Sequence, residues 1–176
     1  MNSTVVKMTA TKKLTINAMC IALTFVATAF INIRLPIMAN GGLIHLGNVP
    51  LFLSAMIFGK KTGAIAGAFG MGLFDLISGW TAWAPFTFII VGIMGYVVGN
   101  ISEKNTIFCY FIAIVVALII KVVGYYIAEM ILYSNCIAPI ASIPGNVVQV
   151  VIAGVMVLPI ITALKKTVLK QIGGIA

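Results

Sequence analysis

Apolar stretches long enough to cross a lipid bilayer recur along the whole chain, and this feature limits the possible folds more than any other. We distinguish six such segments, roughly residues 14–33, 43–58, 62–78, 84–101, 107–133 and 140–164. A bilayer core about 30 Å thick is crossed by about 20 apolar helical residues, and lipid does not tolerate unpaired backbone groups. The sequence therefore predicts an all-α integral membrane protein with six transmembrane helices.

The charged residues support this interpretation. They make up 8% of the 176 residues, while 62% are hydrophobic; a soluble domain is about 25% charged. A net charge of +8 could indicate nucleic-acid binding, but the lysines form short clusters between apolar runs, without an interleaved aromatic stripe. We therefore expect no nucleic-acid partner and use the charges to predict topology.

With six crossings, nine of the 11 basic residues fall on one side of the membrane, and the positive-inside rule places both termini in the cytoplasm. Arg34 falls on the other side and Lys121 lies within the membrane. The predicted organisation is a cytoplasmic segment (1–13), a six-helix membrane domain (14–164) and a cytoplasmic tail (165–176). The nine residues are Lys7, Lys12, Lys13, Lys60, Lys61, Lys104, Lys165, Lys166 and Lys170.

Two of the segments have alternative interpretations. Asn48 and Pro50 interrupt the second segment, yet the basic clusters share one side only if it crosses, with residues 41–50 as an external loop dipping into the protein. The first segment resembles a secretory signal peptide that ends at the small residues 27–29. Its apolar run continues to Ile33, which favours a retained helix, but the charge rule does not decide this point.

Two charged residues lie inside the fifth segment. Lys121 and Glu129 would each cost about 2.5–3.5 kcal/mol at the centre of a bilayer, so such residues usually have a function. With Tyr125 between them, the spacing is i, i+4, i+8, which keeps the three side chains on one broad face of a helix.

Other polar and aromatic residues fall at the same outer end of the predicted bundle. Aromatic rings that stack on a ligand, with donors and acceptors around them, suit a small polar aromatic molecule. The sequence therefore predicts an outward-facing ligand pocket. Besides the three residues of the fifth segment, it includes His45, Asn48, Asp75, Trp80, Trp83, Asn146 and Gln149.

Each group also has a structural explanation, which the sequence leaves open. Intramembrane charges often pair, tryptophans gather at membrane interfaces, and amides join helices. His45 could satisfy loop backbone groups, and Asp75 could cap or pair locally. Small residues four apart allow close helix packing, as in Gly63-x-x-x-Gly67 and Gly95-x-x-x-Gly99.

Signatures of an enzyme are missing from the sequence. The Gly-Lys-Lys-Thr run that ends at Thr62 resembles part of a P-loop, but Ser54 stands where the first glycine is required. We find no Ser/His/Asp set, no Cys nucleophile beside a His, and no HExxH motif. Three cysteines lie in or next to apolar segments without metal-ligand spacing. We therefore expect no catalytic residue, no metal and no cofactor, and energy for any uptake from elsewhere.

Three stretches together resemble a known family. They are IHLGNVPLFLSAMIFGKKTGAIAGAFGMGLFDLISGWTAWAPFTFIIVGIMG (44–95), GYYIAEMILY (124–133) and IPGNVVQVVIAG (143–154). They are similar to the substrate-binding S component of energy-coupling factor (ECF) vitamin transporters, of the hydroxymethylpyrimidine/pyridoxine type. Asn48 and Val91 depart from the family pattern, which has Asp and Lys there; Lys121 would supply the positive group.

The resemblance implies a bacterial plasma-membrane protein that binds one water-soluble vitamin near the extracellular face. It implies docking on a transmembrane T component with two cytosolic ATPases, and delivery by toppling in the membrane. Ala18 and Ala22 match an AxxxA docking pattern on the first helix. The ligand-contacting regions of the family match Trp80, Trp83, Thr87, Tyr125, Glu129, Asn146 and Gln149.

Two other functions fit the same residues. A non-transport assembly or sensor protein would use the polar cluster structurally and bind no small molecule. A stand-alone transporter would use Lys121 and Glu129 in proton coupling and would take up substrate alone in liposomes. A vitamin-binding S component would instead bind its ligand alone but need ATPase subunits for uptake.

Overall fold

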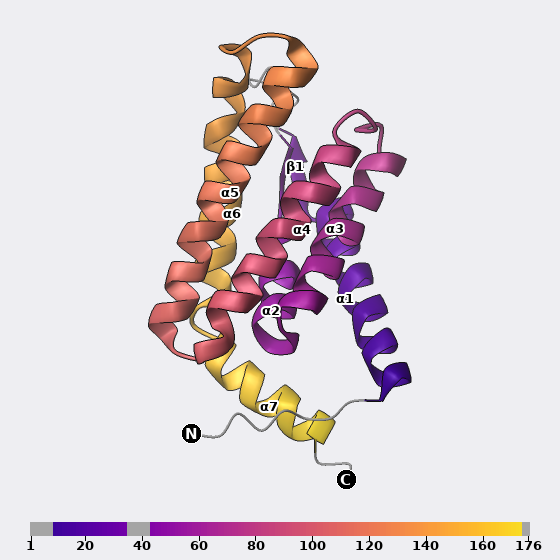
Figure 1. Cartoon of the computed structure of the whole chain (residues 1–176), viewed down its shortest axis with the longest axis vertical. Helices are drawn as coiled ribbons and strands as arrows, with labels where there is room; N and C mark the ends of the chain where they lie inside the picture. The colour runs from indigo at the N-terminus through magenta and orange to yellow at the C-terminus, as the bar shows by residue number, and fades with distance from the viewer. Residues whose placement is uncertain (1–8, 35–42, 174–176) are drawn as a thin grey trace.

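The computed structural model describes residues 9–34 and 43–173, and they fold mainly into α-helices (Figure 1). This confirms the predicted helical class. Lys7 and residues 41 and 42 of the predicted external loop lie outside the described residues. The elements in chain order are α1 (Ala10–Phe30), β1 (Asn32–Arg34), β2 (Leu43–His45), α2 (Asn48–Phe58), α3 (Lys60–Ile77), α4 (Ala84–Ile101), η1 (Ser102–Lys104), α5 (Ile107–Tyr133), η2 (Ala138–Ser142), α6 (Ile143–Val157) and α7 (Ile161–Gly173).

Within the described part of the chain, four helical stretches are long and apolar enough to cross a membrane: Ala10–Phe30, Ala84–Lys104, Ile107–Tyr133 and Ala138–Val157. α3 has 18 residues but includes three charged ones, Lys60, Lys61 and Asp75. α2 has 11 residues, which gives a length of about 16 Å. By itself α2 is too short to cross a bilayer core of about 30 Å.

The short helix α2 lies in the middle of the bundle. Leu51, Phe52 and Ala55 have no exposed surface, and α2 contacts α1, α3, α4, α6 and α7. At its N-terminal end stands the β1–β2 hairpin, in which Ile33 pairs with Ile44. The predicted helical segment 14–33 is therefore wrong at its C-terminal end, where the chain forms β1. The external loop predicted for residues 41–50 contains β2 and the start of α2.

Glycines bring the backbones of α3 and α4 into contact. A Cβ atom built on Gly95 would lie 2.3 Å from the carbonyl oxygen of Gly63, and one on Gly99 would lie 2.4 Å from Cα of Lys60. Only glycine fits at such distances. We call this contact between α3 and α4 the glycine seam. It shows that the small residues of α3 and α4 serve packing within the bundle.

α5 separates an apolar face from a polar one. Residues spaced four apart on its outer face are exposed, among them Val115, Ile119 and Val123. Lys121 and Glu129 face the bundle instead and are 2% and 4% exposed. In a membrane protein the exposed apolar face suits lipid, and the charges are kept inside.

The predicted sixth segment, 140–164, contains two helices rather than one. α6 ends at Val157, a turn containing Pro159 follows, and α7 runs beneath the bundle (bottom of Figure 1). Lys165 of α7 donates to the carbonyl oxygen of Met56 and to Oδ1 of Asn105. The Met56 carbonyl is in the last turn of α2, where a helix has no internal donors and favours a positive charge.

Candidate functional site

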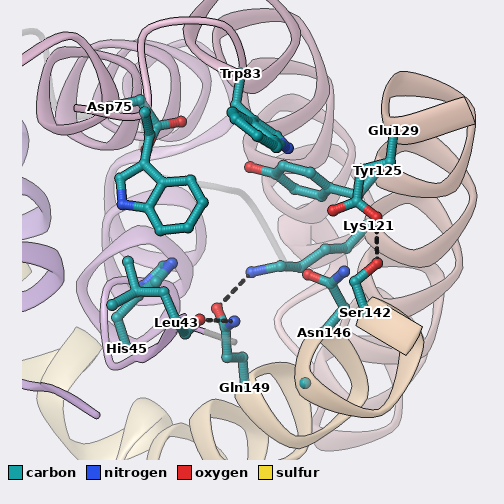
Figure 2. Close-up of a pocket in the computed structure, with 12 residues that line it drawn as sticks. Leu43, His45, Asp75, Trp83, Lys121, Tyr125, Glu129, Ser142, Asn146 and Gln149 are labelled. Carbon is teal, nitrogen blue, oxygen red and sulfur yellow. Dashed lines mark hydrogen bonds between the residues drawn. The ribbon is translucent and has the colours of Figure 1, made fainter. Parts of the chain in front are cut away.

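A pocket lies at the end of the bundle opposite α7, between the hairpin, the α3–α4 loop, α5 and α6 (Figure 2). Its volume is about 100 Å³. The lining combines aromatic rings with amine, carboxyl, amide and imidazole groups. It consists of Leu43, His45, Asp75, Trp80, Trp83, Lys121, Tyr125, Glu129, Ser142, Gly145, Asn146 and Gln149.

A chain of hydrogen bonds joins three elements across the pocket. Nζ of Lys121 donates to Oε1 of Gln149 at 2.8 Å, and Nε2 of Gln149 donates to the carbonyl oxygen of Leu43 at 2.8 Å. Figure 2 shows the Lys121 amine pointing into the open space of the pocket. Gln149 thus fixes the amine of α5 and ties the hairpin to α6.

The side chains further along α5 are also held by neighbours. The hydroxyl of Ser142, which ends η2, donates to the Glu129 carboxylate. The hydroxyls of Tyr125 and Thr87 are 3.0 Å apart, and the Tyr125 ring centre lies 5.8 Å from Nζ of Lys121. These contacts fix the orientation of an aromatic face beside the Lys121 amine.

Aromatic rings from the α3–α4 loop complete the pocket. The ring centres of Trp80 and Trp83 are 5.2 Å apart with planes at 79°, and those of Trp83 and Tyr133 are 6.0 Å apart at 64°. Edge-to-face contacts of this kind are favourable for aromatic pairs. The pocket therefore offers ring faces in nearly perpendicular directions.

His45 enters from the hairpin. Its Nδ1 accepts a hydrogen bond from the backbone N–H of Gly47 at 3.2 Å. The imidazole therefore offers the pocket a hydrogen-bonding group.

Nine of the residues predicted from the sequence line this pocket, although they come from five separate stretches of the chain. Two others lie behind the lining. Thr87 is 1% exposed and contacts Tyr125. Asn48 has no exposed surface, and neither its side-chain nitrogen nor its oxygen has a hydrogen-bond partner in the described residues. Ala18 and Ala22 are exposed on α1.

Sequence reasoning missed three lining residues, Leu43, Ser142 and Gly145. Leu43 contributes its backbone carbonyl, which no side-chain pattern indicates. Ser142 and Gly145 flank the Ile143-Pro144 start of α6. Their position next to Asn146 is a signal that could have suggested them.

One family model matches nearly the whole chain, and two relatives are similar to most of it. The model of the ECF-type riboflavin transporter S component matches residues 8–166. The thiamine precursor transporter HmpT of Lactococcus lactis subsp. cremoris (strain MG1363) is 33% identical over 145 residues, 82% of either chain. An uncharacterized protein of Pyrococcus woesei is 34% identical over 120 residues, 68% of this chain and 80% of that one.

A solved structure shares the fold. It is described as the S component of a bacterial ECF transporter, and it superposes with a TM-score of 0.68 at 21% sequence identity. The match covers 91% of this chain and 99% of the other.

Proposed function

Because the chain belongs to the family of ECF-type riboflavin transporter S components, we propose that it captures a small water-soluble vitamin or vitamin precursor in the pocket around Lys121. Members of this family are membrane-embedded transport proteins and not enzymes. One observation carries the proposal: aromatic faces and hydrogen-bonding groups from separate elements meet around the Lys121 amine, which points into an open space.

The proposed ligand has one aromatic ring. The name of the HmpT relative supports a thiamine precursor, such as hydroxymethylpyrimidine. Pyridoxine has a ring of the same size with similar hydroxymethyl groups, and we propose it as the second candidate.

The proposed topology has six crossings with both termini in the cytoplasm. In it, α3 crosses, α2 crosses together with the hairpin, and α7 lies at the cytoplasmic face. The pocket then opens to the extracellular side. The distribution of the basic residues along the sequence supports this arrangement, because six crossings place nine of the 11 on the cytoplasmic side.

Transport requires partners in this proposal. The exposed Ala18 and Ala22 give a smooth surface on α1 where a transmembrane T component can approach closely. Two cytosolic ATPases supply the energy, and toppling of the S component delivers the ligand to the cytoplasm. Uptake is expected only when all of these subunits are present.

Titration of the purified protein in detergent tests the proposal. The ligands are hydroxymethylpyrimidine, thiamine, pyridoxine, pyridoxamine and riboflavin, and the readout is intrinsic fluorescence. The chain contains two tryptophans, and both line the pocket. Saturable quenching by a one-ring compound is expected. Flat traces for all five compounds on a folded sample would contradict the proposal and favour a structural polar cluster.

A further inference from the structure

We propose a second binding site, for one anionic phospholipid, in a groove between α1 and α7. The groove lies where the N-terminal half of α1 meets α7, at the bottom of Figure 1 and at the end of the bundle opposite the pocket around Lys121. The site goes beyond the proposed function, because it assigns a lipid to a surface that vitamin binding does not use.

The polarity of the groove changes in one direction along α1. The lining residues of α1 from Thr9 to Thr15 carry hydroxyl or amine groups. Those from Ile16 to Leu23 are apolar, counting the thiol of Cys20 as a small hydrophobe. A phospholipid has the same order, a polar headgroup followed by apolar chains. The groove therefore fits a phospholipid with its headgroup at the start of α1.

The apolar part of the groove fits within one leaflet of a bilayer. The helical rise from Ile16 to Leu23 is about 10 Å, and one leaflet of the hydrocarbon core is about 15 Å thick. Met19 and Leu23 are 59% and 57% exposed, so this part of the groove is open on the outer face of α1. Phe58 of α2 and Val168 of α7 line the same groove. An acyl chain lying here would contact apolar side chains of three helices.

Lysines at this end of the bundle complement a phosphate group. Lys12 lines the groove, and its Nζ donates to the carbonyl oxygen of Ile172 at 2.5 Å, which joins α1 to α7. This bond uses one of the three donors of an ammonium group, and lysine is a common partner of phosphate. The same two helices also carry the exposed Lys13, Lys166 and Lys170.

Acidic side chains do not compensate these lysines. The whole sequence has three, Asp75, Glu103 and Glu129. Asp75 and Glu129 line the pocket at the other end, and Glu103 pairs with Lys60 at 3.0 Å. No ion pair within the described part of the chain involves a lysine of α1 or α7. The cytoplasmic leaflet, where the proposed topology places this end, supplies anionic headgroups, so the charge favours an anionic lipid over a zwitterionic one.

The groove is distinct from the surface proposed for the T component. Ala18 and Ala22 are not among its described lining residues. With 3.6 residues per turn, they point about a quarter of a turn away from Lys12, Met19 and Leu23. A lipid in the groove therefore leaves the small-residue face of α1 free for a protein.

Native mass spectrometry of the full chain, released from detergent micelles, tests the site. The probes are phosphatidylglycerol and phosphatidylcholine with identical acyl chains, added at equal concentration. We expect one bound phosphatidylglycerol and at least about a fivefold preference for it, the effect of one lysine near an anionic group. Lys12→Gln should remove most of this preference, and Lys12→Arg should keep it. Lys61→Gln, at an exposed position that is not among the described lining residues, is the matched control and should leave it unchanged.

A second pair of variants tests the acyl part of the groove. Met19→Gln places a polar group on its apolar wall and should weaken both lipids a few-fold, because an acyl chain loses apolar contact there. Leu14→Gln is the matched control, since Leu14 is 71% exposed on the same helix and is not among the described lining residues. It should leave the binding of both lipids unchanged.

Equal binding of the two lipids to wild type would overturn the site. An equal loss of preference in Lys61→Gln and Lys12→Gln would do the same, because the lysines would then act only as a diffuse charge. Retention of no lipid by folded wild type would also overturn it and leave the groove to a protein segment. If Lys12→Gln does not fold, as judged by thermal unfolding, the wild-type preference and Met19→Gln decide. Vitamin titration reports on the other end of the bundle, so failure of the proposed function is seen separately.

Discussion

Two lysines at opposite ends of the bundle have similar neighbours and different contacts. Nζ of Lys121 lies 5.8 Å from the ring centre of Tyr125, and Nζ of Lys165 lies 5.9 Å from that of Tyr110. Lys165 donates to a backbone carbonyl at the end of α2 and to the side chain of Asn105. Lys121 donates to one amide, that of Gln149, and faces a cavity.

The difference shows how a structural lysine can be told from a ligand-binding one. An ammonium group has three donors, and at Lys165 two of them bond the Met56 carbonyl and Oδ1 of Asn105, which are groups of the fold itself. At Lys121 the hydrogen bond to Gln149 uses one donor, and the amine faces the space where a ligand would lie. Burial and an aromatic neighbour are common to both lysines and do not distinguish them.

The largest effect is expected for Lys121→Met. It removes the donor that faces the ligand, so affinity should fall by about a hundredfold, as for other buried charged contacts. Stability should change little, because the substitution also removes the cost of burying a charge. Titration and thermal unfolding of the same sample check both parts. Loss of folding with unchanged affinity in residual protein would make Lys121 a structural lysine.

Lys165→Met should show the reverse pattern. Met56 and Asn105 would lose a charged donor, which lowers the free energy of unfolding by about 1–3 kcal/mol. Ligand affinity should not change, because the pocket lies at the other end of the bundle. Chemical denaturation in detergent measures the loss, and Lys166→Met, at an exposed position of the same helix, is the matched control. A tenfold change in the ligand affinity of Lys165→Met would contradict the conclusion that only the Lys121 end of the bundle binds ligand.

Gln149→Leu should have an intermediate effect on binding, a loss of about tenfold in affinity, because Lys121 loses the acceptor that orients it. The affinity of the double variant Gln149→Leu/Lys121→Met is then compared with the affinities of the two single variants. If Gln149 acts through Lys121, the two losses will not add. Full additivity would mean that Gln149 contacts the ligand independently.

Ser142→Ala should have the smallest effect. It removes one hydroxyl donor to the Glu129 carboxylate but leaves the carboxylate in the pocket, and so affinity should fall only a few-fold. Thr81→Ala, an exposed position in the neighbouring loop, serves as the control. A loss as large as that of Lys121→Met would show that Glu129, and not Lys121, dominates ligand binding.

The sequence predicted the long helices well. The segments 84–101 and 107–133 have the observed bounds of α4 and α5, because long, mainly apolar runs lie between clear polar caps such as Thr106. The hairpin and α7 were not predicted. Ile33, Ile44 and Ile161 are apolar like their helical neighbours, so hydrophobicity alone does not show where the backbone changes direction.

Most of the candidate site was predicted because its residues are polar where the surroundings are apolar. Lys121, Glu129 and Gln149 are conspicuous for this reason. Their contacts were not predictable: the sequence left open a pairing of Lys121 with Glu129, whereas the structure joins Lys121 to Gln149 and Glu129 to Ser142. Such contacts depend on how α6 and η2 pack against α5, which sequence spacing does not give.

The glycine seam determines which parts of the pocket can move. Backbones in direct contact cannot slide past each other without clashes, so α3 and α4 form a rigid frame that carries Asp75 and the two tryptophans. The opposite wall, α5 and α6, is linked to the hairpin through Gln149 and Leu43. We therefore expect a ligand to enter between this frame and the opposite wall, and not between α3 and α4.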